Sequence, residues 1–246
     1  MKSPFTADFD FSKYINEVKR TETIHYIGHV SKVNGLEIES TGPRSVIGEM
    51  CTIKIPSSKT ELMAEVVGLS GTTVKLTAFG DTKGIEIGCE VVASGSVLQV
   101  AVGEGLLGRV IDATGRPYDG LGAVSAKTFY PAIAEPPNPM TRMPTDRRIT
   151  TGVRAIDSLL TVAKGQRMGI FAGSGVGKST LISMIARNTN ADINVIALIG
   201  ERGREVMDFI RRDLGEEGLK RSVVIVATGD QPSICRLRAA YVATAI

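Results

Sequence analysis

The feature that most constrains this chain is a glycine-rich stretch at residues 172–180, which reads Ala-Gly-Ser-Gly-Val-Gly-Lys-Ser-Thr. The residues before it, 168–172, form a short apolar run that predicts a buried parallel strand, and apolar residues recur at helical spacing after it. In a glycine-rich turn between a strand and a helix, successive backbone N–H groups point at phosphate oxygens, and the helix dipole there favours negative charge. The stretch therefore predicts a phosphate-binding loop.

This loop implies a nucleotide and a metal. We expect Lys178 to reach the β and γ phosphates of ATP and the Ser179 hydroxyl to ligate Mg²⁺. The residues expected to bind the nucleotide are Gly173, Ser174, Gly175, Val176, Gly177, Lys178, Ser179 and Thr180. One position departs from the strict pattern, because the chain has Ala172 where that pattern opens with glycine. The alternative interpretation is a strand-to-helix turn with a surface lysine and no ligand.

Composition argues against several other classes of protein. The 246 residues carry a net charge of only +3, and aromatic residues make up 5% with no Trp, so the chain lacks the basic surplus and the stacking platforms of a nucleic-acid binder. The three cysteines show no paired spacing and are accompanied by two histidines, which argues against a zinc or thiol site and favours a reducing cytoplasm. The sequence has no run of about 18 apolar residues, so we expect no membrane-spanning helix.

Hydrophobic periodicity divides the first part of the chain into three segments. Residues 1–22 predict an amphipathic helix or extension, which would lie on its own chain, a partner or a lipid surface, with four apolar residues on one face: Phe11, Tyr14, Ile15 and Val18. In residues 23–95, apolar and polar residues alternate with a period of two, in short stretches separated by Gly and Pro. This pattern predicts a small all-β barrel or sandwich with a structural role. Residues 96–150 predict a Gly/Pro-rich junction.

The last segment, residues 151–246, alternates between strand and helix patterns. After the strand of the phosphate loop, the expected elements are a helix over 177–188, a strand over 193–199, a helix over 204–214, a strand over 222–227 and a helix from about Ser233. This order predicts an α/β P-loop domain with a mostly parallel sheet. Ligands of such sheets bind beyond the carboxyl ends of the strands, where both the loop and Glu201 are expected to lie.

Glu201 is the second candidate site residue, because it follows an uninterrupted apolar strand at this sheet edge. Hydrolysis of a γ-phosphate needs a water that is held in line and relieved of a proton, and a carboxylate at that edge can do both. Arg202 beside it would steady the carboxylate or sense phosphate. A surface ion pair explains Glu201 and Arg202 equally well, so the residues by themselves leave both interpretations open.

The phosphate loop, combined with the later Gly-Glu-Arg-Gly-Arg-Glu-Val at residues 200–206, resembles the rotary-type ATPase superfamily. Within it, the pattern is most similar to the bacterial flagellar protein-export ATPases and their type III secretion relatives. Supporting stretches lie at residues 108–112, 115–120, 152–157 and 222–228. The likeness covers essentially all of residues 22–246, and this combination is more specific than any one motif.

The resemblance implies a RecA-like nucleotide domain in residues 151–246 and a barrel that helps to form a hexameric ring. It implies Mg²⁺-dependent ATP hydrolysis that energises flagellar protein export, with Lys178, Glu201 and Arg202 as catalytic residues and Ser179 as metal ligand. The implied partners are further copies of the chain, a stalk-like regulatory protein at the N-terminus, a central-stalk protein, the export gate and chaperone–substrate complexes. The implied location is the cytoplasm, peripheral at the inner face of the membrane, with no nucleic-acid partner.

The chain departs from the family in its length. It ends at Ile246, before the second strand-end aspartate, the adenine pocket, the C-terminal domain and the arginine finger that the family possesses. We therefore expect a fragment, incomplete at its C-terminus, that hydrolyses ATP weakly or not at all by itself.

Four alternative functions stay open. An injectisome type III secretion ATPase has the same chemistry and differs in the stalk protein and chaperones that it binds. Proton-coupled synthesis would identify a catalytic ATP synthase subunit, and RNA-stimulated hydrolysis would identify an RNA-translocating hexameric ATPase. In a non-catalytic module, nucleotide would only order a protein-docking surface, and replacing Glu201 would leave turnover unchanged.

Overall fold

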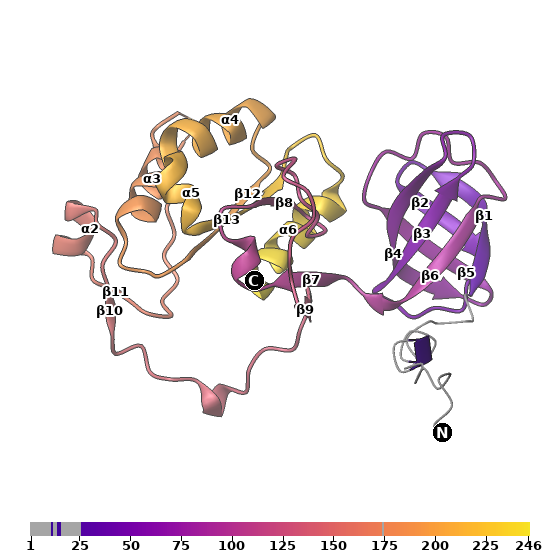
Figure 1. Ribbon diagram of the computed structural model, residues 1–246, viewed down its shortest axis with the longest axis horizontal. Coiled ribbons are helices and arrows are strands. Elements are labelled where there is room, and N and C mark those ends of the chain that lie inside the picture. The colour runs from indigo at the N-terminus through magenta and orange to yellow at the C-terminus, as the bar shows by residue number, and fades with distance from the viewer. Residues whose placement is uncertain (1–10, 12–13, 16–25, 174) are drawn as a thin grey trace, which may run out of the picture.

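The computed structural model describes residues 11, 14–15, 26–173 and 175–246. Figure 1 shows a β-barrel beside an α/β part that contains the C-terminus. The helix predicted over residues 1–22 lies mostly outside the described residues, and so does the loop residue Ser174. In the part of the chain that the structure describes, no helix is both long enough and apolar enough to span a bilayer.

Six antiparallel strands close into the barrel in the order β1-β2-β5-β4-β3-β6. Their bounds are β1 Ile27–Asn34, β2 Glu37–Thr41, β3 Glu49–Ile55, β4 Thr60–Ser70, β5 Thr73–Ala78 and β6 Glu90–Val97. Alternate side chains point inward, as the period of two requires, and Ile38, Ile53 and Leu76 are fully buried in the barrel core. Pairing of β1 with β6 closes the sheet, which confirms the predicted all-β barrel.

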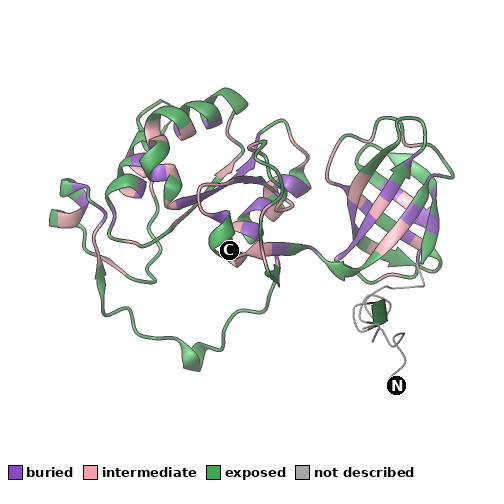
Figure 2. Ribbon diagram, viewed as in Figure 1, coloured by how far each residue is buried: buried purple, intermediate pink, exposed green. Residues whose placement is uncertain are grey.

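The α/β part is built on a three-stranded parallel sheet in the order β12-β13-β8. Its strands are β12 Asn194–Ile199, β13 Ser222–Ala227 and β8 Val110–Asp112. Every residue of the central strand β13 is buried, as the purple ribbon in Figure 2 indicates. Burial on both faces is the reason why β13 has a continuous apolar sequence and no alternation.

Helices cover both faces of this sheet, which confirms the α/β class. One face carries α3 Lys178–Asn188, α4 Gly203–Asp208, the π-helical segment η3 Phe209–Leu214 and α5 Gly215–Lys220. The other face carries α6 Ser233–Ala245, whose Ile234, Ala239 and Val242 share a core with alternate residues of β13. The helix predicted over 204–214 corresponds to α4 and η3 together, whereas α5 is an element that the sequence pattern did not predict.

Residues 96–150 do more than connect two parts, because they supply β8 to the parallel sheet. Val100 and Leu106 of this segment are buried in the same core as α6. The sequence does not predict β8, since a strand of three residues is too short to show a period. Two further strand pairs are short: β7 Gln99–Val102 pairs with β9 Thr128–Pro131, and β10 Arg148–Ile149 pairs with β11 Val162–Ala163. The remaining short elements are the 3₁₀ turns η1 Glu104–Leu106 and η2 Pro139–Thr141 and the helix α2 Arg154–Leu159.

The strand predicted over residues 168–172 is wrong for this structure. These residues pair with no described strand, and the Phe171 side chain is 98% exposed. A buried parallel strand needs hydrogen-bonded neighbours, but β13 already lies between β12 and β8 and no described strand lies beside 168–172. An apolar run by itself does not provide such a neighbour, so the apolar pattern at 168–172 was not enough to predict a strand.

An ion pair between Arg109, directly before β8, and Asp119, in the turn after β8, links these two segments. The Arg109 guanidinium donates to both carboxylate oxygens of Asp119, at 2.7 Å from Nε and 3.0 Å from Nη2. The backbone N–H groups of Val110 and Leu121 donate to the same carboxylate, each at 3.0 Å. These donors, above all the Arg109 side chain, hold the pKa of Asp119 well below its usual range.

We expect Asp119 to stabilise the fold at neutral pH and to lose this effect in acid. Because the pKa of Asp119 is lower in the folded than in the unfolded chain, its stabilisation is complete above about pH 4 and falls as the pH drops through the folded pKa. Urea unfolding from about pH 7 to about pH 2 should therefore show a smaller loss of stability for Asp119→Asn than for the parent. An identical pH dependence of the two proteins would contradict this assignment.

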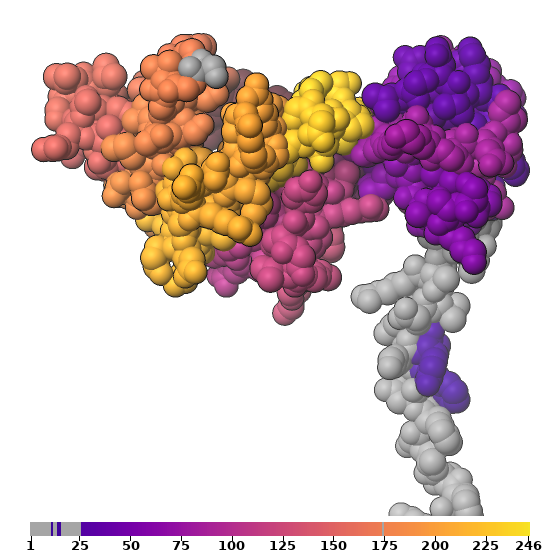
Figure 3. Space-filling model, turned by 90° about the horizontal axis from the view of Figure 1, so that it is seen from above, coloured from indigo at the N-terminus to yellow at the C-terminus, as the bar shows by residue number. Residues whose placement is uncertain are grey.

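The barrel and the α/β part meet at α6, which lies against the barrel in Figure 3. The Arg238 guanidinium of α6 pairs with the Glu65 carboxylate of β4 through both carboxylate oxygens, with an Nε–Oε2 distance of 2.7 Å. Close by, the Cys235 thiol donates to the Phe79 carbonyl at 3.4 Å. The side chains of Arg238 and Glu65 are only 12% and 5% exposed. A buried ion pair therefore fixes α6 to the barrel wall.

Candidate nucleotide-binding site

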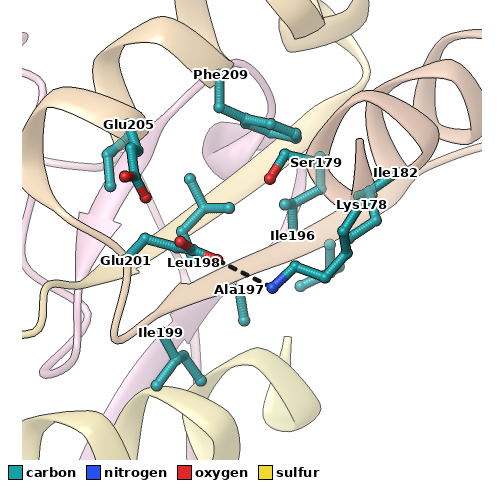
Figure 4. Close-up of a pocket in the computed structure, with 12 residues that line it drawn as sticks. Lys178, Ser179, Ile182, Ile196, Ala197, Leu198, Ile199, Glu201, Glu205 and Phe209 are labelled. Carbon is teal, nitrogen blue, oxygen red and sulfur yellow. Dashed lines mark ion pairs between the residues drawn. The ribbon is translucent and has the colours of Figure 1, made fainter. Parts of the chain in front are cut away.

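The candidate site lies where the end of β12 meets the start of α3, at the carboxyl edge of the parallel sheet (Figure 4). β12 ends at Ile199, and Gly200 then turns the chain with a left-handed φ of +77° before Glu201. Glycine adopts this conformation without the steric cost that a Cβ would bring. The Gly200 N–H donates to the Ala227 carbonyl at 2.7 Å, so the turn is tied to the end of the neighbouring strand β13.

Helix α3 brings a cation to the same edge. It begins at Lys178, directly after Gly177, and Ser179 follows in its first turn. The Lys178 ammonium lies 3.6 Å from a carboxylate oxygen of Glu201, and the two side chains are 44% and 31% exposed. Figure 4 shows these side chains pointing toward each other beside β12. The structure thus brings together the lysine and the carboxylate that the sequence assigned separately to one sheet edge.

These side chains line a cavity of about 420 Å³. Lys178 and Ser179 come from α3, Glu201 from the turn after β12 and Glu205 from α4. The rest of the lining is apolar and comes from α3, β12, α4 and Phe209. A largely apolar cavity with a few convergent polar groups is the usual form of a small-molecule site. The sequence did not single out Glu205, whose available signal was its place in the first turn of α4, four residues after Glu201.

Other predicted site residues lie outside this cavity. The Arg202 guanidinium pairs with Glu205 at 3.7 Å, so the surface ion pair considered from the sequence forms with Glu205, while Glu201 faces Lys178. Of the loop residues that the structure describes, Lys178 and Ser179 line the cavity. The others are exposed beside it: Gly173, Gly175, Val176, Gly177 and Thr180.

The residues present fit a phosphate group and Mg²⁺. A Cβ placed at Gly175 or Gly177 would meet no described atom within 4 Å, so the space over both loop glycines is open. The 11 residues of α3 follow directly, and the free N–H groups and dipole at a helix start attract anions. The Ser179 hydroxyl and the carboxylates on the opposite wall are oxygen donors of the kind that Mg²⁺ prefers.

Two family models match the two parts of the fold. The model for the beta-barrel domain of the ATP synthase alpha/beta family matches residues 30–95, and the model for the nucleotide-binding domain of the same family matches residues 152–246. The chain belongs to the ATP synthase alpha/beta family. The second match begins just before α2 and contains α3, β12 and β13, so the candidate site lies within the nucleotide-binding domain of this family.

Relatives in this family include proteins of bacterial secretion systems. The flagellum-specific ATP synthases of Treponema pallidum (strain Nichols) and Bacillus subtilis (strain 168) are 56% and 53% identical to the chain, over 95% and 94% of its length. The type 3 secretion system ATPase of Xanthomonas euvesicatoria is 48% identical over 89%. The matched region makes up 52%, 53% and 50% of these relatives, so the chain spans about half the length of the curated relatives it matches.

Two solved structures of a similar ATPase show the same architecture. The assembled ATPase EscN from the enteropathogenic E. coli type III secretion system is 42% identical, with a TM-score of 0.78 over 88% of this chain and 52% of EscN. EscN in complex with its central stalk EscO gives a TM-score of 0.79 over 88% of this chain and 53% of EscN. The barrel and the nucleotide-binding part are therefore arranged as in this type III secretion system ATPase.

Proposed function

We propose that this chain is the N-terminal portion of an ATPase that energises flagellar, type III protein export. The Lys178–Glu201 pair is the observation on which the proposal rests, because it puts a phosphate-binding cation and a candidate general base on the walls of one cavity. The flagellar assignment is supported by the relatives named flagellum-specific ATP synthase, at 56% and 53% identity.

In the proposed site, the backbone N–H groups of residues 173–180 bind phosphate oxygens and Lys178 neutralises charge on the β and γ phosphates of ATP. The Ser179 hydroxyl would hold Mg²⁺, which when bound offsets the charge on the transferred phosphate. Glu201 holds the attacking water in line and accepts its proton at a carboxylate oxygen. Arg202 contacts the phosphate, after its ion pair with the Glu205 carboxylate breaks.

In this mechanism the lysine has two alternative partners. The Lys178 ammonium lies beside Glu201 in this structure, and phosphate oxygens would draw it toward the loop. That movement removes the positive charge next to the Glu201 carboxylate. Nucleotide binding thereby leaves the carboxylate available to a water molecule.

The assembly and the location are proposed on the same grounds. We expect a homo-hexamer with a central-stalk protein, since the solved relative EscN is described as assembled and as bound to its central stalk. The further partners that we propose are a stalk-like regulatory protein at the N-terminus, the export gate and chaperone–substrate complexes, at the inner face of the membrane. We also propose a division into an N-terminal extension, a barrel domain, a junction and an ATPase domain, over residues 1–22, 23–95, 96–150 and 151–246.

An injectisome ATPase is the second candidate, favoured by the 48% identity to the type 3 secretion system ATPase of Xanthomonas euvesicatoria and by the likeness to EscN. The site chemistry is the same in both candidates, so partner binding has to separate them. We expect the chain to bind flagellar stalk and chaperone proteins in preference to their injectisome counterparts. Preference for the injectisome set would favour the second candidate.

Replacing Lys178 with alanine tests the phosphate site. Loss of a charge-assisted contact with phosphate should weaken ATP binding by roughly 10- to 100-fold, which titration with a fluorescent ATP analogue in excess Mg²⁺ would measure. Lys32→Ala is the matched control, because Lys32 is an exposed lysine of the barrel. Equal ATP affinity of Lys178→Ala and the parent would show that the loop is not a phosphate site.

A further inference from the structure

Gly229 lies against the turn that carries Glu201. The Gly229 N–H donates to the Glu201 carbonyl at 3.0 Å, from the loop that follows the neighbouring strand β13. A Cβ added at Gly229 would lie 3.1 Å from the Gly200 carbonyl oxygen, which is closer than ordinary van der Waals contact. The backbone of Gly229 is thus hydrogen-bonded to Glu201, and the Gly200 carbonyl limits the space for a side chain at position 229.

Neither side of this contact is free to move away. Gly200 is held by its own N–H, which donates to the Ala227 carbonyl at 2.7 Å. Gly229 is held from α6, because the Arg236 guanidinium donates from Nη1 to the Gly229 carbonyl at 2.9 Å. The Gln231 N–H donates to the Thr228 carbonyl at 3.1 Å and closes the loop around Gly229. A Cβ at position 229 would therefore require the Gly200 carbonyl, in the peptide unit before Glu201, to shift by a few tenths of an ångström.

We propose that Gly229 is a positioning residue for Glu201, and that Arg236 holds Gly229 in place. The inference rests on the proposed role of Glu201 as the base that orients water. The direction of the Glu201 side chain follows from its backbone, and the Gly229 N–H holds that backbone through the Glu201 carbonyl. Lys178 and Ser179 lie on α3 and, among the described residues, form no hydrogen bond or ion pair with residues 228–231, so phosphate binding and carboxylate positioning depend on different elements.

The expected effect is a loss of turnover without a loss of affinity. A displacement of about 1 Å in a catalytic group can cost up to about 100-fold in rate. Because the shift needed for one Cβ is only a few tenths of an ångström, we expect Gly229→Ala to lower kcat by roughly threefold and the bulkier Gly229→Val by roughly 10-fold or more. The Kd for ATP should stay within about twofold of the parent. Phosphate release by the full-length protein measures kcat, and fluorescent nucleotide titration measures Kd.

Two further variants complete the test of Gly229: a control substitution at another glycine, Gly203→Ala, and the substitution Arg236→Met, which adds no side chain at position 229. Gly203→Ala should leave kcat unchanged, because a Cβ at Gly203 would meet no described atom within 4 Å. Arg236→Met should lower kcat and speed hydrogen exchange of the Gly229 amide, since the hydrogen bond from Arg236 to the Gly229 carbonyl is lost. Arg236→Lys keeps a donor at this site and should restore part of both. Arg236→Met also covers the case in which Gly229→Val fails to fold.

The outcomes separate this inference from the proposed function. If Glu201→Gln loses turnover but Gly229→Ala and Arg236→Met keep it, the positioning role is overturned and the role of Glu201 stands. If Glu201→Gln keeps full turnover, the proposed function itself is wrong. A parallel loss of ATP affinity and kcat in Gly229→Ala would indicate general damage to the site and would also overturn the positioning role.

Discussion

We expect replacement of Glu201 with glutamine to lower ATP turnover by about 100- to 10,000-fold, the range typical of the loss of a general base. Glutamine keeps the size of the side chain and its place on the cavity wall, but it cannot accept the proton of the attacking water. The same change removes the negative charge that lies 3.6 Å from the Lys178 ammonium. We therefore expect ATP affinity to be equal to or higher than that of the parent, because phosphate no longer competes with a carboxylate for the lysine.

Phosphate release by the full-length protein and titration with a fluorescent ATP analogue measure these two quantities. Glu216→Gln is the matched control, because Glu216 is an exposed glutamate of α5 outside the cavity lining. The control should retain the turnover of the parent. Equal turnover of Glu201→Gln and the parent would favour the non-catalytic module over an ATPase.

The second large effect concerns the contact between α6 and the barrel. Arg238→Ala should lower the free energy of unfolding by about 3–5 kcal/mol, because it leaves the Glu65 carboxylate buried without its partner. The Glu65 side chain is only 5% exposed, so bulk water does little to solvate its carboxylate. Urea or thermal unfolding of the purified chain, followed by circular dichroism, measures the loss.

Two further variants test the physical reason for this loss. The double variant Glu65→Gln/Arg238→Met removes both charges and should recover most of the stability, since no isolated charge is left inside. Lys54→Ala breaks an exposed pair with Glu90, whose Nζ–Oε2 distance is 3.1 Å, and should cost less than about 1 kcal/mol. Similar losses in Lys54→Ala and Arg238→Ala would show that burial does not set the strength of the Arg238 pair.

Much of the fold follows from short-range pattern, and the exceptions have a common cause. The barrel and the strands β12 and β13 were predictable because each has a clear period or a long apolar run. The failure at residues 168–172 arises because strand formation depends on a neighbour, and β8 was missed because three residues carry no period. Pairing partners are set by the tertiary fold and are not visible in a local pattern.

The site divides in the same way. Lys178 and Glu201 were predicted as neighbours because both were expected to follow strands of one parallel sheet. The structure brings them together although residues 168–172 form no strand, since α3 itself packs against β12. Glu205 and Gly229 were not, since one depends on the direction of α4 and the other on a 3.0 Å contact between two loops. The ion-pair partner of Arg202 could not be predicted from the sequence either, because two glutamates, Glu201 and Glu205, lie close to it along the chain.

The closure of the six-stranded barrel limits how this part of the protein can meet other molecules. Its main-chain donors and acceptors are used within the cylinder, so a neighbouring subunit cannot dock by extending the sheet and has to recognise outward-facing side chains. Those positions can diverge without disturbing the hydrogen-bonded ladder. Proteins that share this cylinder can therefore differ in the molecules that they bind while their strands pair in the same way.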